Sequence, residues 1–408
     1  MTTPKEKIAD IAERVGRFFF FGLILFIPIV NAGVETCFGF VLICFLIKKI
    51  IRPDFAFLKK PEHILLLLFF IFCGLSMVNS GPYIKKSLTA LFLKWFKYIG
   101  LFLITQDLLS NEKYIKRAMT AVLVVAGIIG IDAIAQFFIG FDLFRHNPAF
   151  IVHIPNGTAC RGLTASFKHY NGFGAYLIVV SSLATALLFS PKKLNLPEPK
   201  RVLLFLLAGL LAVCLLLAGS RGAWLGFICG LALMILLCRQ YKRLILLTGS
   251  FIGALIIFPA LRERIFSTLR PEGDSLRLDV WSAAFQLIRE NPFLGKGVGT
   301  FMAYYHQQRP DVSPVYAHNC YLQIWAETGI FSLLAFIFFF SLILYKGIKV
   351  YRKNLNPFLL GLICGLFGFL IHCFFDSHLY SLQLAFLFWL MLGSLVAATK
   401  LATNQHNV

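Results

Sequence analysis

The sequence predicts an all-α, polytopic membrane protein, and three observations support this fold class. Hydrophobic residues make up 58% of the 408 positions and charged residues only 14%, which is more apolar than an average soluble protein. The mean hydropathy is +0.78. Apolar stretches of about 20 residues, the length that a helix needs to cross a membrane, recur along the whole chain. We therefore expect a single integral membrane domain over residues 1–408.

About twelve stretches meet this length requirement. In chain order they lie near residues 17–32, 34–47, 63–79, 86–106, 118–139, 169–190, 202–219, 222–238, 244–260, 320–344, 357–375 and 380–399. Asn31 and Glu35 predict a turn that reaches water between the first two stretches. The first stretch lacks a clear small-residue cleavage site, so we interpret it as a retained helix rather than a signal peptide.

The formal net charge of +20 would suit a nucleic-acid-binding protein, but its distribution argues against that class. The basic residues gather near the N-terminus and in every second link between the apolar stretches. The main clusters are Lys5, Lys7, Arg14 and Arg17; Lys48, Lys49, Arg52, Lys59 and Lys60; Lys113, Lys116 and Arg117; Lys192, Lys193, Lys200 and Arg201; Arg239, Lys242 and Arg243; and Lys346, Lys349, Arg352 and Lys353. This alternation is typical of the positive-inside rule and predicts that both termini are cytoplasmic.

The links on the opposite side include two long ones, residues 140–168 and 261–319. Loops longer than about 15 residues are usually functional when they form no domain of their own. We therefore expect the chemistry on the outer, non-cytoplasmic side, with residues 261–319 as a large loop or lid.

Within this large loop, residues 275–290 predict an amphipathic helix. Its apolar positions recur at helical spacing, at Leu278, Trp281, Ala284, Phe285 and Ile288. Pro292 follows the helix, and the stretch GKGVG comes next. A glycine-rich turn with a lysine is compatible with a phosphate cradle, but this one lacks the Walker spacing, which favours a plain tight turn.

Arginines on the outer side run against the positive-inside bias and need another explanation. Arg161 precedes the sixth apolar stretch, Arg221 lies alone between two stretches, and Arg277 falls in the first turn of the predicted amphipathic helix. A centred arginine costs about 2.5 to 3.5 kcal/mol on insertion scales, so it normally faces a polar cavity. Snorkelling to lipid headgroups for Arg221 and a solvated face for Arg277 are the alternatives to anion binding.

His318 ends the large loop and lies directly before Asn319 and an apolar stretch. Imidazole side chains titrate near pH 6.5, so they can take a proton at neutral pH as a general base must. Arginines on the same side suit a doubly negative group such as a diphosphate. Asp376 could orient His318 or an arginine, or be a structural carboxylate, while Lys168, His169 and Asn171 could line the same cavity.

The ten cysteines are mostly dispersed in apolar stretches and show no zinc-type spacing. We expect no metal and no cofactor, and we interpret His372 and His378 as interface residues. Cys160 and Cys320 could both face the outer compartment, where disulfides are allowed, and whether they pair stays open.

Four stretches resemble, in order, the O-antigen ligase and polymerase superfamily of bacterial envelope glycosyltransferases. TASFKHYNGFGAYL is similar to a phenylalanine-x-histidine-x-asparagine helix start, and GSRGAWLG to a serine-arginine-glycine junction. SLRLDVWSAAFQLIRENPFLGKGVGTF resembles an arginine-x-x-x-tryptophan helix with a glycine turn. HNCYLQIWAETGIFSLL resembles the ligase pattern through His318, Asn319 and Gly329, although Ser332 stands where ligases often have glycine, threonine or tyrosine.

This resemblance implies a GT-C-like fold and transfer of a glycan from undecaprenyl diphosphate to a sugar hydroxyl of lipid A-core. The reaction would occur at the periplasmic face of the inner membrane, without a metal, and would invert the transferred sugar. Carried onto this chain, His318 would be the catalytic base, with Asn319, Asp376, Lys168 and His169 in support. The arginines that would hold the diphosphate are Arg161, Arg221 and Arg277, with Arg221 also acting in catalysis.

The alternatives are an O-antigen polymerase with the same donor, a protein O-oligosaccharyltransferase and a membrane transporter. Protein-directed transferases tend to carry an added C-terminal domain, whereas here only KLATNQHNV follows the last apolar stretch. A transporter is expected to have charges on both halves of a pathway and broken helices at the midplane. The sequence leaves open the transferred glycan, the acceptor hydroxyl and the oligomeric state.

Overall fold

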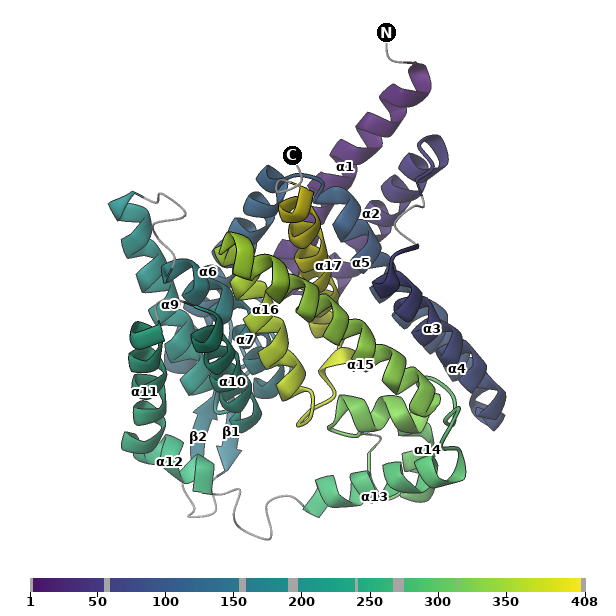
Figure 1. Cartoon of the computed structure of the whole chain (residues 1–408). Coiled ribbons are helices and arrows are strands. Elements are labelled where there is room, and N and C mark those ends of the chain that lie inside the picture. The colour runs from purple at the N-terminus through teal and green to yellow at the C-terminus, as the bar shows by residue number, and fades with distance from the viewer. Residues whose placement is uncertain are drawn as a thin grey trace.

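The computed structural model describes residues 3–54, 59–153, 159–189, 197–238, 241–266, 275–313 and 315–404. Helices dominate these ranges, as the apolar composition predicts. The N- and C-termini lie at the same end of the helical bundle (Figure 1). A departure from the all-α prediction is a short antiparallel hairpin formed by β1 (Phe150–His153) and β2 (Ala159–Gly162), in which Ile151 pairs with Arg161.

Each predicted apolar stretch contains a helix. These helices are α1 (Pro4–Phe26), α2 (Asn31–Ile51), α3 (Pro61–Leu75), α4 (Ile84–Ala90) continuing into α5 (Phe96–Leu108), α6 (Glu112–Ile139), α7 (Tyr170–Leu188), α9 (Glu198–Ala218), α10 (Arg221–Leu237), α11 (Tyr241–Ile257), α15 (Cys320–Asn354), α16 (Pro357–His372) and α17 (Leu382–Asn404).

Seven of the described helices or helix runs are long and apolar enough to cross a membrane. The number becomes eight if α11 and α12 (Pro259–Phe266), which meet at an angle of 86°, count as one broken span. Helices α10 and α16 are apolar but shorter. The protein is thus a multi-pass membrane protein, while twelve crossings and a cytoplasmic location of both termini stay predictions.

Helices α10 and α16 cross at very close range because glycines line their contact. A Cβ atom added at Gly226 would lie 2.6 Å from the carbonyl oxygen of Gly368, and one added at Gly230 would lie 2.9 Å from that of Cys364. Small residues allow backbones to approach in this way in membrane proteins. At the start of α10, a Cβ added at Gly222 would lie 2.6 Å from the His372 ring. This packing places the N-terminus of α10 against the end of α16.

Helices α12, α13 (Ser275–Glu290) and α14 (Phe301–Gln308) lie with the hairpin at the end of the molecule away from the termini (Figure 1). Helix α13 has the predicted bounds. Its predicted apolar face is only partly right, because Leu278 and Phe285 are 63% and 48% exposed. The buried face instead carries Val280, Ala284 and Leu287, which pack in a small cluster with α14 and α15. Helical spacing alone did not distinguish these two apolar faces.

The GKGVG turn encloses a carboxylate of its own chain. The buried Glu327 accepts hydrogen bonds from the backbone N–H groups of Gly299, at 2.8 Å, and of Phe301, at 3.3 Å. Gly329 breaks the helical dihedrals of α15 with φ 81°, and a Cβ there would lie 1.9 Å from the carbonyl oxygen of Phe293. The turn is therefore a tight structural turn packed against α15. Glu327 occupies the backbone amide of Gly299, in the turn, and that of Phe301, at the start of α14.

Candidate active site

Three arginines line one cavity of about 330 Å³ at the end of the bundle that carries α12 and α13. They are Arg221 at the start of α10, Arg264 on α12 and Arg277 in the first turn of α13. Tyr170, Asn171, Trp281 and His372 supply further polar or aromatic lining, and Leu225, Leu278 and Phe375 supply apolar lining. An amphiphilic cavity with converging guanidinium groups is suited to an anion attached to an apolar chain.

Arg221 owes its position to the start of α10. The Ser220 hydroxyl caps this helix by accepting from the backbone N–H of Ala223 at 3.4 Å. The close contact of Gly222 with His372 then fixes this first turn against α16. A helix N-terminus carries a partial positive charge that adds to the guanidinium charge. Arg221 thus lines the cavity, and the binding of an anion by its guanidinium group stays a prediction.

Arg264 is a cavity residue that the sequence interpretation did not single out. Its Nε donates to the carbonyl oxygen of Gly219 at 3.2 Å, and its Nη2 donates to the hydroxyl of Tyr170 at 2.8 Å. Its guanidinium also lies 5.6 Å from the centre of the Tyr170 ring. Arg264 thus links α12 to the junction before α10. The signal was present, because it is another basic residue on the side where the positive-inside rule predicts few.

Helix α13 connects the cavity to the segment that carries His318. Arg277 and Trp281 are one helical turn apart, and both line the cavity. The indole N–H of Trp281 donates to the carbonyl oxygen of Ala317 at 3.0 Å. Ala317 directly precedes His318, so the arginine-bearing helix holds the backbone next to the imidazole.

His318 lies at the entrance of α15 in a left-handed backbone conformation, with φ 50°. Asn319 is the N-cap of this helix, and its side-chain oxygen accepts from the backbone N–H groups of Tyr321 and Leu322 at 3.0 Å. The His318 side chain is 31% exposed, and its Nδ1 lies 3.1 Å from Oδ1 of Asp376. The supporting role predicted for Asn319 is therefore placed at the backbone that positions His318.

Asp376, in the turn between α16 and α17, holds several donors at once. Besides His318, its Oδ1 accepts from the backbone N–H of Ser377 at 2.8 Å, and its Oδ2 accepts from Nδ2 of Asn171 at 3.0 Å. Burial alone would raise the pKa of this carboxyl, but the hydrogen bond from His318 and the positive charges of nearby histidines lower it well below its usual range. An ionised carboxylate only accepts hydrogen bonds, so Nδ1 of His318 is the donor and Nε2 can accept a proton.

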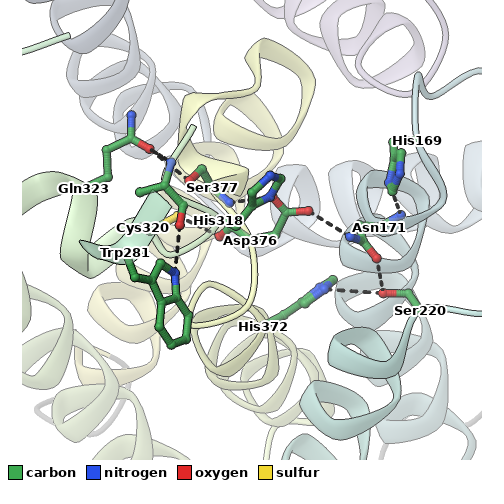
Figure 2. Close-up of polar contacts among 11 residues, drawn as sticks. His169, Asn171, Ser220, Trp281, His318, Cys320, Gln323, His372, Asp376 and Ser377 are labelled. Carbon is green, nitrogen blue, oxygen red and sulfur yellow. Dashed lines mark hydrogen bonds and ion pairs between the residues drawn. The ribbon is translucent and has the colours of Figure 1, made fainter. Parts of the chain in front are cut away.

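The hydrogen bonds continue from Asp376 to the start of the arginine-bearing helix α10 (Figure 2). The side-chain oxygen of Asn171 accepts from the Ser220 hydroxyl at 2.7 Å. The Ser220 oxygen also lies 3.5 Å from Nε2 of His372. This chain joins four segments that are distant in sequence, and it connects the imidazole of His318 to the residue next to Arg221. Asn171 lines the cavity as the sequence predicts, whereas we did not predict the role of Ser220 or the hydrogen bond from Asn171 to Asp376.

His169 and Lys168 have different surroundings from the cavity arginines. His169 is the N-cap of α7, where its Nδ1 accepts from the backbone N–H of Asn171 at 3.2 Å. Burial lowers the pKa of the His169 imidazole; the Asp376 carboxylate opposes this shift, and the charges of Arg264 and Arg277 add to it. The Lys168 side chain is exposed and is not among the residues that line the cavity.

The side chain of Arg161 lies outside the part of the chain that the structure describes, although its backbone is in β2. Its predicted contact with a diphosphate therefore stays a prediction. Cys160 has the same status, but Cys320 is a free, buried thiol that donates to the carbonyl oxygen of Asp376 at 3.3 Å. The pairing of Cys160 with Cys320 that the sequence left open involves the Cys160 side chain, which lies outside the described part of the chain.

His372 and His378 pack against each other, with ring centres 4.1 Å apart. Burial lowers the pKa of His378 to about 4, with repulsion from His169 and His318 adding to it and Asp376 opposing it. Within the described ranges, no group of three or more His, Cys, Asp or Glu side chains is arranged to hold a metal ion. His372 also lines the arginine cavity, and the interpretation of the two histidines as interface residues stays a prediction.

A family model described as O-antigen ligase matches residues 203–337. Residues 203–337 therefore match an O-antigen ligase domain, and this match supports the O-antigen ligase and polymerase superfamily. The matched range contains the three cavity arginines and His318. An uncharacterized protein of Haemophilus influenzae is 26% identical to this chain over 189 residues, and the match spans 39% of this chain and 46% of that protein. Superfamily membership does not distinguish a ligase from a polymerase.

Proposed function

We propose that the protein is an O-antigen ligase, which transfers a glycan from undecaprenyl diphosphate to a sugar hydroxyl of lipid A-core at the periplasmic face of the inner membrane. One observation carries this proposal. Arg221, Arg264 and Arg277 surround a single cavity, and a chain of hydrogen bonds joins its wall to the carboxylate–imidazole pair of Asp376 and His318. Neither His318 nor Asp376 is among the residues that line this cavity; Asn171, in its wall, is their link to it. A general base linked to a cluster of cations suits transfer from a diphosphate leaving group.

In this mechanism, Nε2 of His318 takes the proton of the acceptor hydroxyl as its oxygen attacks the anomeric carbon of the donor sugar. The new glycosidic C–O bond forms while the bond between that carbon and the diphosphate oxygen breaks. The electron pair of the broken bond leaves with undecaprenyl diphosphate, and its growing charge is stabilised by the arginines. Attack from the face opposite the leaving group inverts the sugar. The His318 proton is afterwards released to water.

Asp376 would act as a positioning residue in this reaction. Its hydrogen bond to Nδ1 keeps Nε2 in the form that accepts a proton, and its charge stabilises the imidazolium that results. The arginine-bearing helices supply the anion site, so a donor that already carries a good leaving group needs only positioning, proton removal and charge stabilisation. In this mechanism the described residues supply the proton acceptor and the positive charges that the reaction needs.

Ser332, which differs from the glycine, threonine or tyrosine that ligases often have at this position, is not part of the arginine cavity. Ser332 is fully buried, and its hydroxyl lies 3.7 Å from the sulfur of Cys73, on the far side of the break at Gly329. It does not line the arginine cavity. Its identity is therefore a matter of helix packing between α3 and α15, which leaves the ligase proposal intact.

The surface glycolipids of a deletion strain test the proposal against a polymerase. A ligase predicts that full-length glycan chains accumulate on the lipid carrier, and that a plasmid copy of the gene restores their attachment to lipid A-core. Single repeat units joined to lipid A-core would instead show a polymerase. Purified protein in liposomes that contain both lipid substrates should produce the joined glycolipid, visible as a ladder on a gel.

A further inference from the structure

A second pocket, of about 370 Å³, lies among α3, α15 and α17, where Lys60, Lys346 and Lys400 converge. It includes the last turns of α17, and the C-terminus lies at the end of the bundle that also carries the N-terminus (Figure 1). Ile343 and Val396 provide its apolar lining. The positive-inside rule predicts that this end is cytoplasmic.

The positive charges of this pocket are only partly offset. Nζ of Lys346 lies 2.6 Å from Oε2 of the buried Glu62, so one carboxylate pairs with one of the three ammonium groups that line the pocket. Lys60 is the N-cap of α3, where the helix dipole disfavours a cation. Burial lowers the pKa of Lys60, and repulsion from Lys400 and Lys346 adds to this, while Glu62 opposes it. The pocket therefore has a local excess of positive charge.

Membrane topology alone does not explain this convergence. The positive-inside rule requires basic residues in the link but does not require them to face one another. Lys349 and Lys353, on the same helix as Lys346, are exposed and do not line the pocket. A lysine on α15 can therefore satisfy the positive-inside rule from an exposed position, without facing the pocket as Lys346 does.

We infer that this pocket binds the phosphate headgroup of an anionic membrane phospholipid. Three ammonium groups next to an apolar wall suit an amphiphile whose charged head stays at the membrane surface and whose chains enter the bilayer. Basic pockets between transmembrane helices on the cytoplasmic side are a recurrent way to bind such headgroups. Free phosphate shares the charge but would gain nothing from Ile343 and Val396.

The hydroxyls of the pocket indicate what kind of selectivity to expect. Thr399 and Thr403 donate their hydroxyl protons to the carbonyl oxygens of Leu395 and Thr399, at 2.7 and 2.9 Å. Recognition of phosphate therefore falls to the ammonium groups, which act as point charges rather than as a rigid fork. The site should select by charge and take phosphatidylglycerol in preference to zwitterionic phosphatidylcholine.

Native mass spectrometry of the full-length protein in detergent tests this inference. The protein should retain phosphatidylglycerol, and the double variant Lys60→Gln with Lys400→Gln should retain it about thirtyfold more weakly, since each lysine near an anionic headgroup contributes about fivefold. The matched control is Lys349→Gln with Lys353→Gln, which removes the same charge from α15 outside the pocket. It should change retention by less than about twofold, and Lys60→Arg with Lys400→Arg should preserve binding.

Equal retention of phosphatidylcholine, or an equal loss in the control variant, would overturn the site. Displacement of the lipid by excess inorganic phosphate would show that free phosphate is the ligand and overturn the assignment to a lipid. If the double variant fails to fold, Lys400→Gln alone, on an exposed position of α17, should weaken retention about fivefold. Lipid retention is measured without glycan transfer, so a negative result here would not contradict the proposed function, and a negative result there would not contradict the lipid site.

Discussion

His318 and Asp376 lie 58 positions apart in the chain, yet their side chains meet with Nδ1 of the imidazole 3.1 Å from Oδ1 of the carboxylate. The contact closes the entrance of α15 against the turn that follows α16. The backbone N–H of Cys320 donates to the carbonyl oxygen of Cys373 at 2.8 Å and holds the same two segments together. The His318 imidazole is thereby held in place by backbone and side-chain contacts at once.

His318→Ala should reduce glycan transfer by a hundredfold or more, because general base catalysis contributes about 10² to 10⁴ in rate. The measurement is the rate of transfer by purified protein in liposomes, after its melting temperature has been compared with that of the unchanged protein. His306→Ala is the control, since His306 is exposed on α14 and does not line the cavity. Normal surface attachment of glycan by a well-folded His318→Ala protein would refute the assignment.

Asp376→Asn should lower transfer at least tenfold, because the amide no longer fixes the imidazole tautomer or stabilises the imidazolium. The transfer rate in liposomes is measured together with the melting temperature of the variant. A loss of activity that only follows the loss of folded protein would mean that Asp376 is structural.

Arg221→Lys should reduce transfer at least tenfold even though it keeps the charge, because lysine cannot reproduce the planar, bidentate contact with a phosphate. Arg221→Ala should cost a hundredfold or more, as expected for the removal of a preorganised charge donor. Arg289→Lys serves as the control, because Arg289 is exposed at the end of α13 and outside the cavity. Full activity of Arg221→Lys would remove the argument for bidentate binding.

Glu327→Ala should lower the free energy of unfolding by at least about 3 kcal/mol, because each buried donor left unsatisfied costs about 1 to 3 kcal/mol. Its carboxylate accepts from two backbone N–H groups of the glycine turn and from the Tyr380 hydroxyl, at 3.1 Å. Glu290→Ala, which removes the exposed pair with Lys296, should cost less than about 1 kcal/mol. Equal denaturant midpoints for both variants would contradict the structural role of Glu327.

Acidification from pH 7 to pH 5 should destabilise the protein through His378. Because its pKa is lowered to about 4 in the folded protein from 6.5, the unfolded chain binds more protons in this window, and stability is lost as pH falls below about 6.5. The contribution at pH 5 is about 2 kcal/mol. Thermal melting at both pH values measures it, and His378→Gln should shrink the difference. An unchanged difference in this variant would place the pH sensitivity elsewhere.

The sequence by itself determined the helices and the amphipathic segment. Apolar runs of helix-spanning length and the spacing within residues 275–290 are local patterns, so the positions of α13 and the apolar helices followed from them. Local patterns also singled out Arg221, Arg277 and His318, because an arginine or histidine beside an apolar run is conspicuous without knowledge of its neighbours. The same reasoning could not decide what occupies the GKGVG turn.

Only the tertiary structure decided which of these residues meet. Asn171 reaches Asp376 across 205 positions and Ser220 across 49. Such contacts depend on the close packing of α7 against α10 and α16 rather than on any periodic pattern. Other tertiary contacts brought Arg264 into the cavity, through Gly219 and Tyr170, and placed Glu327 under the glycine turn. Hydrophobic periodicity indicates that a helix has a buried face, but it does not specify which element covers that face, since many partners bury the same area. In α13 it did not even distinguish between two apolar faces, because Leu278 and Phe285 are exposed. The meeting of these side chains at one site therefore follows from the packing of the helices and not from local sequence patterns.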